Sequence, residues 1–196
     1  MDRITLLFQE FLNDATNRDD IIYSLTQSTV EPIICFKFGS WLSKRNISNI
    51  NILELNNVDL IIGINTELFF MEFGHLLNLL KHNFEFSKRK VTSDCEKLNK
   101  KIESFSSHHK NLIEDKILHK VTIGLFSDFK GKLKSNKFEV NYKGNLETGT
   151  FLKYGTSKKD NKYFGGYADQ FRNFGYTETV IIHNEISLWW KFQLCD

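Results

Sequence analysis

Apolar residues near the start of the chain recur at three- and four-residue spacing, which is the pattern of an amphipathic helix. Asp2 can cap the first turn of this helix. The apolar positions that share its buried face are Ile4, Leu7, Phe8, Phe11 and Leu12. A polar stretch over residues 13–20 is expected to separate this helix from the next apolar segment.

A second helix is predicted from about Thr29 to Lys44. Ser28 and Glu31 have the spacing of a capping box, and Pro32 is tolerated in a first helical turn. The apolar residues that follow form a broad apolar face of this helix.

The pattern then changes from a helical period to three short β-prone runs. These runs are Ile50–Leu55, Val58–Ile64 and Glu67–Phe73. The breaks between them are Asn56-Asn57 and Asn65-Thr66, and asparagine tolerates the positive φ of a tight turn. The three runs therefore predict an antiparallel meander.

The remaining pattern predicts an α/β fold with a mixed central sheet, the meander plus a further strand, flanked by helices. The further elements expected are a helix from Ser93 to about Ser106, a strand over Val121–Phe126, extended aromatic runs at Phe138–Tyr142 and Phe151–Tyr154, and a hairpin of Thr179–His183 with Ile186–Phe192. We expect a single domain over residues 1–196, with a core at about 29–126 and an aromatic α/β extension at about 137–196.

Composition changes this picture little, because 41% hydrophobic and 26% charged residues are ordinary for a globular domain. The net charge of +2 means that any nucleic-acid contact must be local. Cys35, Cys95 and Cys195 lie far apart, which predicts reduced thiols and a cytoplasmic protein. No apolar run approaches the roughly 20 residues needed to span a membrane, so no membrane association is expected.

The meander carries a chemical consequence, because its two turns fix which residues lie opposite each other. Leu55 would pair with Val58, and Ile64 with Glu67, if both turns contain two residues. Glu54, Asp59 and Glu72 would then lie in one row across three strands, with neighbouring Cβ atoms about 4.5–5.5 Å apart.

Such a row of acids opposes folding unless a cation compensates it. Two carboxylates about 5 Å apart repel by roughly 3 kcal/mol at an effective dielectric near 20. Hard oxygen ligands suit Mg²⁺ or Mn²⁺, which could activate water and stabilise charge on a phosphodiester. The alternative is that these acids are simply solvated on an exposed face, since a slip of one residue would turn Glu72 to the other side.

The segments VDLII (Val58–Ile62) and LFFMEFG (Leu68–Gly74) resemble the core of the PD-(D/E)XK, or restriction endonuclease-like, nucleases. The resemblance implies that Asp59 and Glu72 bind Mg²⁺ and that the substrate is DNA. It also implies a further acid from the preceding helix, for which Glu31 in EPIICFKFGSWL is the match. The segments DCEKLNKKIESF and KVTIGLF match the helix and strand that follow in that family.

The sequence departs from the family at Gly74, which takes the place of the motif lysine two residues after Glu72. Some members supply this cation from the following helix, where Lys97, Lys100 and Lys101 are candidates and Lys97 is nearest the expected helix start. We therefore expect a Mg²⁺-dependent deoxyribonuclease with Asp59, Glu72 and Lys97 as catalytic residues. The alternative is an inactive nuclease fold that binds a protein or nucleic acid.

Two short basic segments, expected as loops, could hold DNA phosphates, which supply most non-specific affinity for DNA. Their residues are Lys88, Arg89, Lys90, Lys132 and Lys134. Both segments also fit an ordinary solvated surface. The resemblance further suggests a homodimer, because many members of the family pair two copies to cut both strands.

Overall fold

The computed structural model describes residues 2–26, 30–55, 58–75, 84–129, 137–142, 145–150, 172–182 and 186–195. Its helices are α1 (Asp2–Asn13), α2 (Ala15–Thr26), α3 (Val30–Lys44), α5 (Phe84–His108) and α6 (Lys110–Ile113). Its strands are β1 (Ile50–Leu55), β2 (Val58–Ile64), β3 (Glu67–His75), β4 (Ile117–Phe129), β5 (Lys137–Tyr142), β6 (Asn145–Thr150), β7 (Thr177–Ile182) and β8 (Ile186–Leu194). None of these helices is long and apolar enough to cross a membrane.

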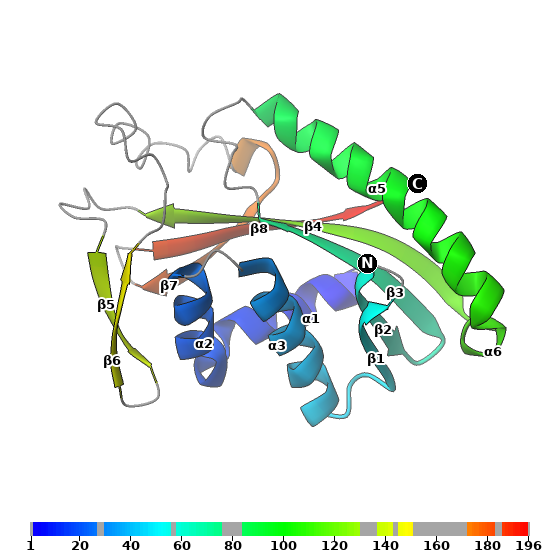
Figure 1. The fold of residues 1–196 in the computed structure, drawn as a ribbon, viewed down its shortest axis with the longest axis horizontal. Coiled ribbons are helices and arrows are strands. Elements are labelled where there is room, and N and C mark those ends of the chain that lie inside the picture. The colour runs from blue at the N-terminus through cyan, green and yellow to red at the C-terminus, as the bar shows by residue number, and fades with distance from the viewer. Residues whose placement is uncertain are drawn as a thin grey trace.

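Six strands form one mixed sheet in the order β1-β2-β3-β4-β8-β7. Strands β3 and β4 are parallel, and the other neighbours in this sheet are antiparallel. Helices α1, α2 and α3 lie on one side of the sheet and α5 lies across the other side (Figure 1). The expected α/β class, with a mixed sheet flanked by helices, is confirmed.

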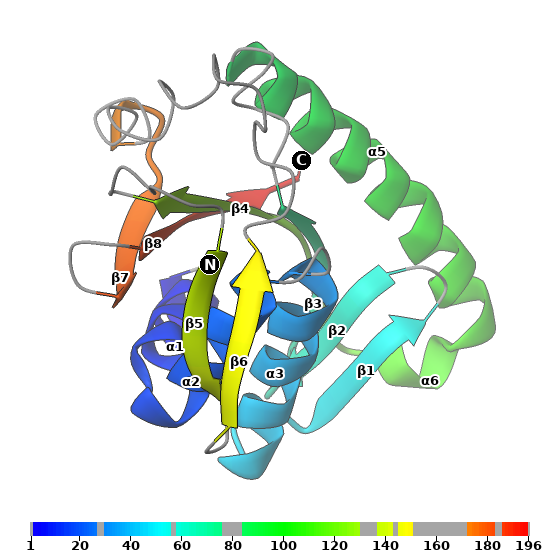
Figure 2. The same ribbon diagram turned by 60° about the vertical axis from the view of Figure 1, so that its left-hand side comes forward.

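The β5–β6 hairpin forms a separate two-stranded sheet, and β5 contacts α2 (Figure 2). Strands β7 and β8 belong to the central sheet, where β8 pairs along β4. The segment expected as a C-terminal extension thus supplies two strands of the central sheet. The predicted hairpin of Thr179–His183 and Ile186–Phe192 is observed as β7 and β8. The run Phe151–Tyr154 lies outside the described residues.

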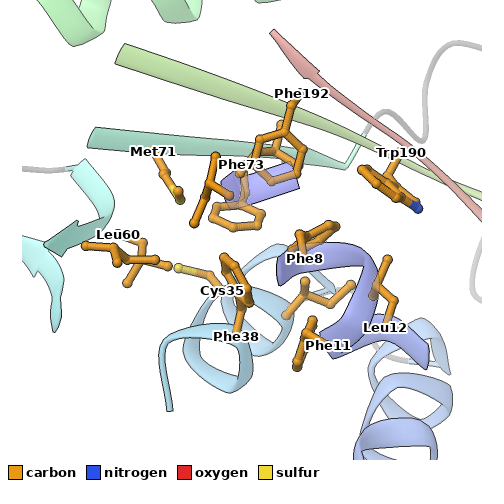
Figure 3. Close-up of a cluster of buried hydrophobic side chains, with 14 of the residues drawn as sticks. Phe8, Phe11, Leu12, Cys35, Phe38, Leu60, Met71, Phe73, Trp190 and Phe192 are labelled. Atoms are coloured by element: carbon orange, nitrogen blue, oxygen red, sulfur yellow. The ribbon is translucent and has the colours of Figure 1, made fainter. Parts of the chain in front are cut away.

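The larger hydrophobic core lies between α1, α3 and the sheet (Figure 3). Phe8 is fully buried at its centre, with its ring centroid 5.0 Å from that of Phe38 and 5.3 Å from that of Trp190. The aromatic stripe of α1 therefore joins α3 to the far strand β8. A smaller core under α5 contains Phe70 and Phe105, whose ring centroids are 5.2 Å apart.

The predicted meander is confirmed together with its register. Leu55 pairs with Val58, and Ile64 pairs with Glu67. Asn65 has a φ of 55°, which is the left-handed conformation that asparagine tolerates in a tight turn. The turn chemistry in the sequence therefore determines which side chains share a face of the sheet.

The residues after α1, expected as a polar spacer, form helix α2. The side chain of Asp14 accepts a hydrogen bond from the backbone N–H of Thr16 at 3.0 Å, which caps this helix. The same carboxylate accepts a bond from Trp41 Nε1 at 2.8 Å and forms an ion pair with Arg45, which tethers α3. These donors hold the pKa of Asp14 well below its ordinary range, with the Trp41 bond as the largest cause.

Helix α5 begins at Phe84, nine residues before the start expected at Ser93. The Ser93–Glu96 pair has the spacing of a capping box but lies in the middle of the helix. Because the helix begins at Phe84, it also contains Lys88, Arg89 and Lys90, which were expected in a loop.

The expectation of three reduced cysteines is wrong, because Cys95 and Cys195 form a disulfide. Cys95 lies on α5 and Cys195 directly follows β8, so sequence spacing alone could not indicate that they meet. Cys35 is buried and takes no part in a disulfide, as expected. The disulfide joins residues 100 positions apart and attaches α5 to the sheet.

Replacing Cys95 and Cys195 together by serine is expected to lower the free energy of unfolding by roughly 2–5 kcal/mol, because the cross-link closes a long loop in the unfolded chain. Urea denaturation followed by circular dichroism measures this difference. A dithiol reductant should destabilise the wild type and the Cys35→Ser control but leave the double variant unchanged. Equal stability of oxidised and reduced wild type would contradict the cross-link.

Candidate functional site

Asp59 of β2 and Glu72 of β3 lie on neighbouring strands, directly after the last pair of the β2–β3 register. The paired residues of the two strands end at Leu60 with Met71, and the negative charge of Asp59 acts on Glu72, so the two carboxylates lie close together. Ile61 and Phe70 belong to the core under α5, so residues of the same parity face that helix. The two acids expected in one row therefore share the α5 face of the sheet.

Glu72 is an acid in a dry environment, with 9% of its surface exposed. Its Oε1 accepts a bond from Lys101 Nζ of α5 at 2.5 Å, and the Lys101 side chain is itself only 18% exposed. Burial is the main cause that raises the pKa of Glu72. Lys101 opposes this shift, whereas the negative charges of Asp59 and Asp94 add to it.

Two hydrogen bonds hold Asp59, one to its carboxylate and one to its backbone carbonyl. Its Oδ2 accepts a bond from the backbone N–H of Phe73 at 2.7 Å, which ties the carboxylate to β3. Its carbonyl oxygen accepts a bond from Cys35 Sγ of α3 at 3.2 Å. The carboxylate is thus oriented by the same two strands that carry the acid pair.

Helix α5 supplies three charged residues with i, i+3 and i+7 spacing, Asp94, Lys97 and Lys101, which places them on one helical face. Asp94 is 8% exposed and accepts a bond from Lys97 Nζ at 3.0 Å, while the Lys97 side chain is 58% exposed. This bond raises the pKa of Lys97, and attraction to Glu72 adds to the shift. The sequence pattern DxxKxxxK could have indicated Asp94.

Lys101 is the lysine of α5 that contacts Glu72. Lys97 was expected because it lay nearest the presumed helix start, but Lys101 contacts Glu72 and Lys97 contacts Asp94. The earlier start of α5, at Phe84, removes the reason for favouring Lys97. Lys100 is exposed.

For most of the other expected site residues, the structure describes only the backbone or nothing at all. Glu54 lies opposite Asp59 in the β1–β2 register, but its side chain lies outside what the structure describes. Glu31 lies in the first turn of α3, one turn before the Cys35 that bonds Asp59. The side chains of the basic trio in α5, and both Lys132 and Lys134, lie outside the described part of the chain.

Thr122 on β4 is the next residue of the row, because it pairs with Glu72 in the parallel register. It is 3% exposed, and its Oγ1 has no hydrogen-bond partner among the described residues. A buried hydroxyl without a partner costs about 1–3 kcal/mol. No sequence pattern singles out this residue, because threonine is common in strands.

Asp59 and Glu72 fit a divalent cation in kind and number, since Mg²⁺ is commonly bound by one or two carboxylates together with water. Their mutual repulsion, seen in the pKa of Glu72, is the cost that a cation would relieve. The buried Thr122 hydroxyl, unpartnered within the described residues, lies at the position that pairs with Glu72. Within the described residues, however, no three histidine, cysteine or acidic side chains converge as a metal-binding group.

No family model matches the sequence, and neither the curated proteins nor the solved structures contain a match. The resemblance to PD-(D/E)XK nucleases therefore stays a prediction carried by the residues themselves.

Replacing Lys101 by methionine is expected to lower the free energy of unfolding at pH 7.5 by about 1–3 kcal/mol, because it leaves the Glu72 carboxylate buried without its cation. In this variant the pKa of folded Glu72 rises further. Ionisation of Glu72 therefore destabilises the folded protein at pH values above 4.5, the ordinary pKa of glutamate. Below that value Glu72 is protonated in both states and the loss should shrink. Urea denaturation at pH 4 and pH 7.5 checks this, with the exposed Lys100→Met as control.

Proposed function

We propose that this chain is a metal-dependent endonuclease-like protein that hydrolyses phosphodiesters of DNA. The observation that carries the proposal is the contact of Lys101 with Glu72, whose carboxylate also feels the negative charge of Asp59 on the neighbouring strand. Two acids and one lysine, from three different elements, thereby meet on one face of the sheet. This is the combination of groups that the family resemblance requires.

Asp59 and Glu72 would hold Mg²⁺ or Mn²⁺. When bound, such an ion supplies Lewis-acid stabilisation of charge on a phosphodiester and activates water. Lys101 takes the part that the resemblance assigns to the lysine missing at Gly74: it directs water and offsets negative charge beside Glu72. The Phe73 N–H keeps the carboxylate of Asp59 in a fixed orientation.

The order of elements supports the proposal as well. Helix α3, strands β1, β2 and β3, helix α5 and strand β4 follow one another as the resemblance implies. Lys97, with a largely exposed side chain one helical turn from Lys101, provides a positive charge on the solvent side of the site. Such a charge suits contact with a DNA phosphate. Pairing of two copies would let the protein cut both strands.

The second candidate function is that of an inactive nuclease fold that binds a partner. The bond between Lys101 and Glu72 favours it, because this contact neutralises the buried acid without a metal ion. Gly74 favours it too, since the strand has lost the motif lysine. In that case the site would bind nucleic acid or protein without hydrolysis.

Nicking of supercoiled plasmid in Mg²⁺ or Mn²⁺ separates these functions. Asp59→Asn and Glu72→Gln should each abolish cleavage. Lys101→Met should reduce the rate by about 10²–10⁴-fold, as expected when a positioned proton-transfer or charge-stabilising group is lost. Lys97→Met should retain the rate within about tenfold, because its contact is with Asp94. Absence of cleavage by folded wild type would favour the inactive module, and equal loss in both lysine variants would contradict the role given to Lys101.

The rate of cleavage should also depend on pH through Glu72, which must be ionised to bind a cation. Because burial raises its pKa, the rate at fixed Mg²⁺ should rise with pH through a range above the ordinary 4.5. Asp94→Asn should move the midpoint to lower pH, since the negative charge of Asp94 contributes to the raised pKa. Rates measured from pH 5 to 9 test this, with the exposed Glu96→Gln as control. If Asp94→Asn leaves the pH midpoint of the cleavage rate unchanged, the pH profile reports the ionisation of a group other than Glu72.

A further inference from the structure

Two glycines face each other on β3 and β4 next to the acid row. Gly74 pairs with Gly124 in the parallel register, two residues along from the pair of Glu72 and Thr122. Side chains alternate along a strand, so these positions are on the α5 face as well. The sheet therefore carries no side chain at two neighbouring positions beside Glu72.

Backbone conformation does not explain these glycines. Among the described glycines, the positive φ belongs to Gly175, so neither Gly74 nor Gly124 occupies a conformation that excludes other residues. The pairing of β3 with β4 is also continuous through both, without a bulge. A strand glycine that serves neither purpose commonly marks a place where a ligand or another backbone approaches closely.

Thr122 lies next to these two glycines, because it lies two residues before Gly124 on the same face of β4. Its hydroxyl is buried and has no partner within the described part of the chain. The hydroxyl can donate one hydrogen bond, and the dry surroundings would strengthen a bond to a charged acceptor. Across the row, Lys101 adds a positive charge from α5. A free donor, a cation and two positions without side chains together suit an oxyanion.

We propose that Thr122 is a substrate-binding residue whose hydroxyl donates a hydrogen bond to a non-bridging oxygen of the scissile phosphate, which lies over Gly74 and Gly124. This inference rests on the proposed function and deepens it by naming the place where the substrate's phosphate binds. The loss of the motif lysine at position 74 then leaves room for the phosphate, while Lys101 supplies the charge from the other side.

The test compares Thr122→Val with Thr122→Ser. Valine keeps the shape of threonine but removes the donor, and serine keeps the donor. Fluorescence anisotropy with a fluorescein-labelled 20-base-pair DNA duplex in Ca²⁺ measures affinity apart from cleavage, and urea denaturation measures stability. Thr122→Val should bind at least tenfold more weakly than the wild type, with an unchanged or higher unfolding midpoint, because a buried unpartnered hydroxyl is removed. Thr122→Ser should bind within threefold of the wild type.

Binding by Thr122→Val within twofold of the wild type would overturn the inference, and a lowered unfolding midpoint would show that the hydroxyl is structural. If the wild type cleaves DNA and Thr122→Val binds equally well, the inference fails and the proposed hydrolysis stands. If DNA binding depends on the hydroxyl but the wild type does not cleave in Mg²⁺ or Mn²⁺, the proposed hydrolysis fails, and the part of the inference that stands is that Thr122 binds a DNA phosphate.

Discussion

The contact between Glu72 and Lys101 is the constraint on which the site depends. A carboxylate that is 9% exposed requires a cation or strong donors nearby, and Lys101 of α5 provides the cation. This contact fixes the helix over the middle of the sheet. The Cys95–Cys195 disulfide and the small core around Phe70 and Phe105 hold the same helix along its length. The ion pair, the disulfide and the aromatic contact thus hold α5 in one position on the sheet.

The placement of the cation on a helix has a structural consequence for the sheet. In the resemblance to PD-(D/E)XK nucleases, the lysine would project from β3 at position 74 and fill the space beside the acid. Here that position is Gly74, and its partner Gly124 on β4 also lacks a side chain. The lysine instead reaches Glu72 from above the sheet. Under the proposed function, Lys101 of α5 would supply the positive charge that Gly74 cannot.

Much of the sheet could be predicted from the sequence because the deciding signals are local. Asparagine-containing turns set the register, so the sequence alone is enough to place Asp59 and Glu72 on one face. The choice among the lysines could not be made, because it depends on where α5 begins, and a spacing typical of a helix cap at Ser93 proved to lie within the helix. Thr122 and the disulfide are consequences of tertiary pairing between segments far apart in the chain, which no local pattern carries.

The central claim is that Asp59 and Glu72 form a divalent-cation site, and Mn²⁺ binding tests it most directly. Titration of the protein with Mn²⁺ at pH 7.5, followed by electron paramagnetic resonance of the free ion, counts the bound ions. We predict one bound ion per chain that is lost in Asp59→Asn and in Glu72→Gln and retained in the exposed Glu96→Gln. The same binding by wild type and both site variants, or no binding by folded wild type, would contradict the claim.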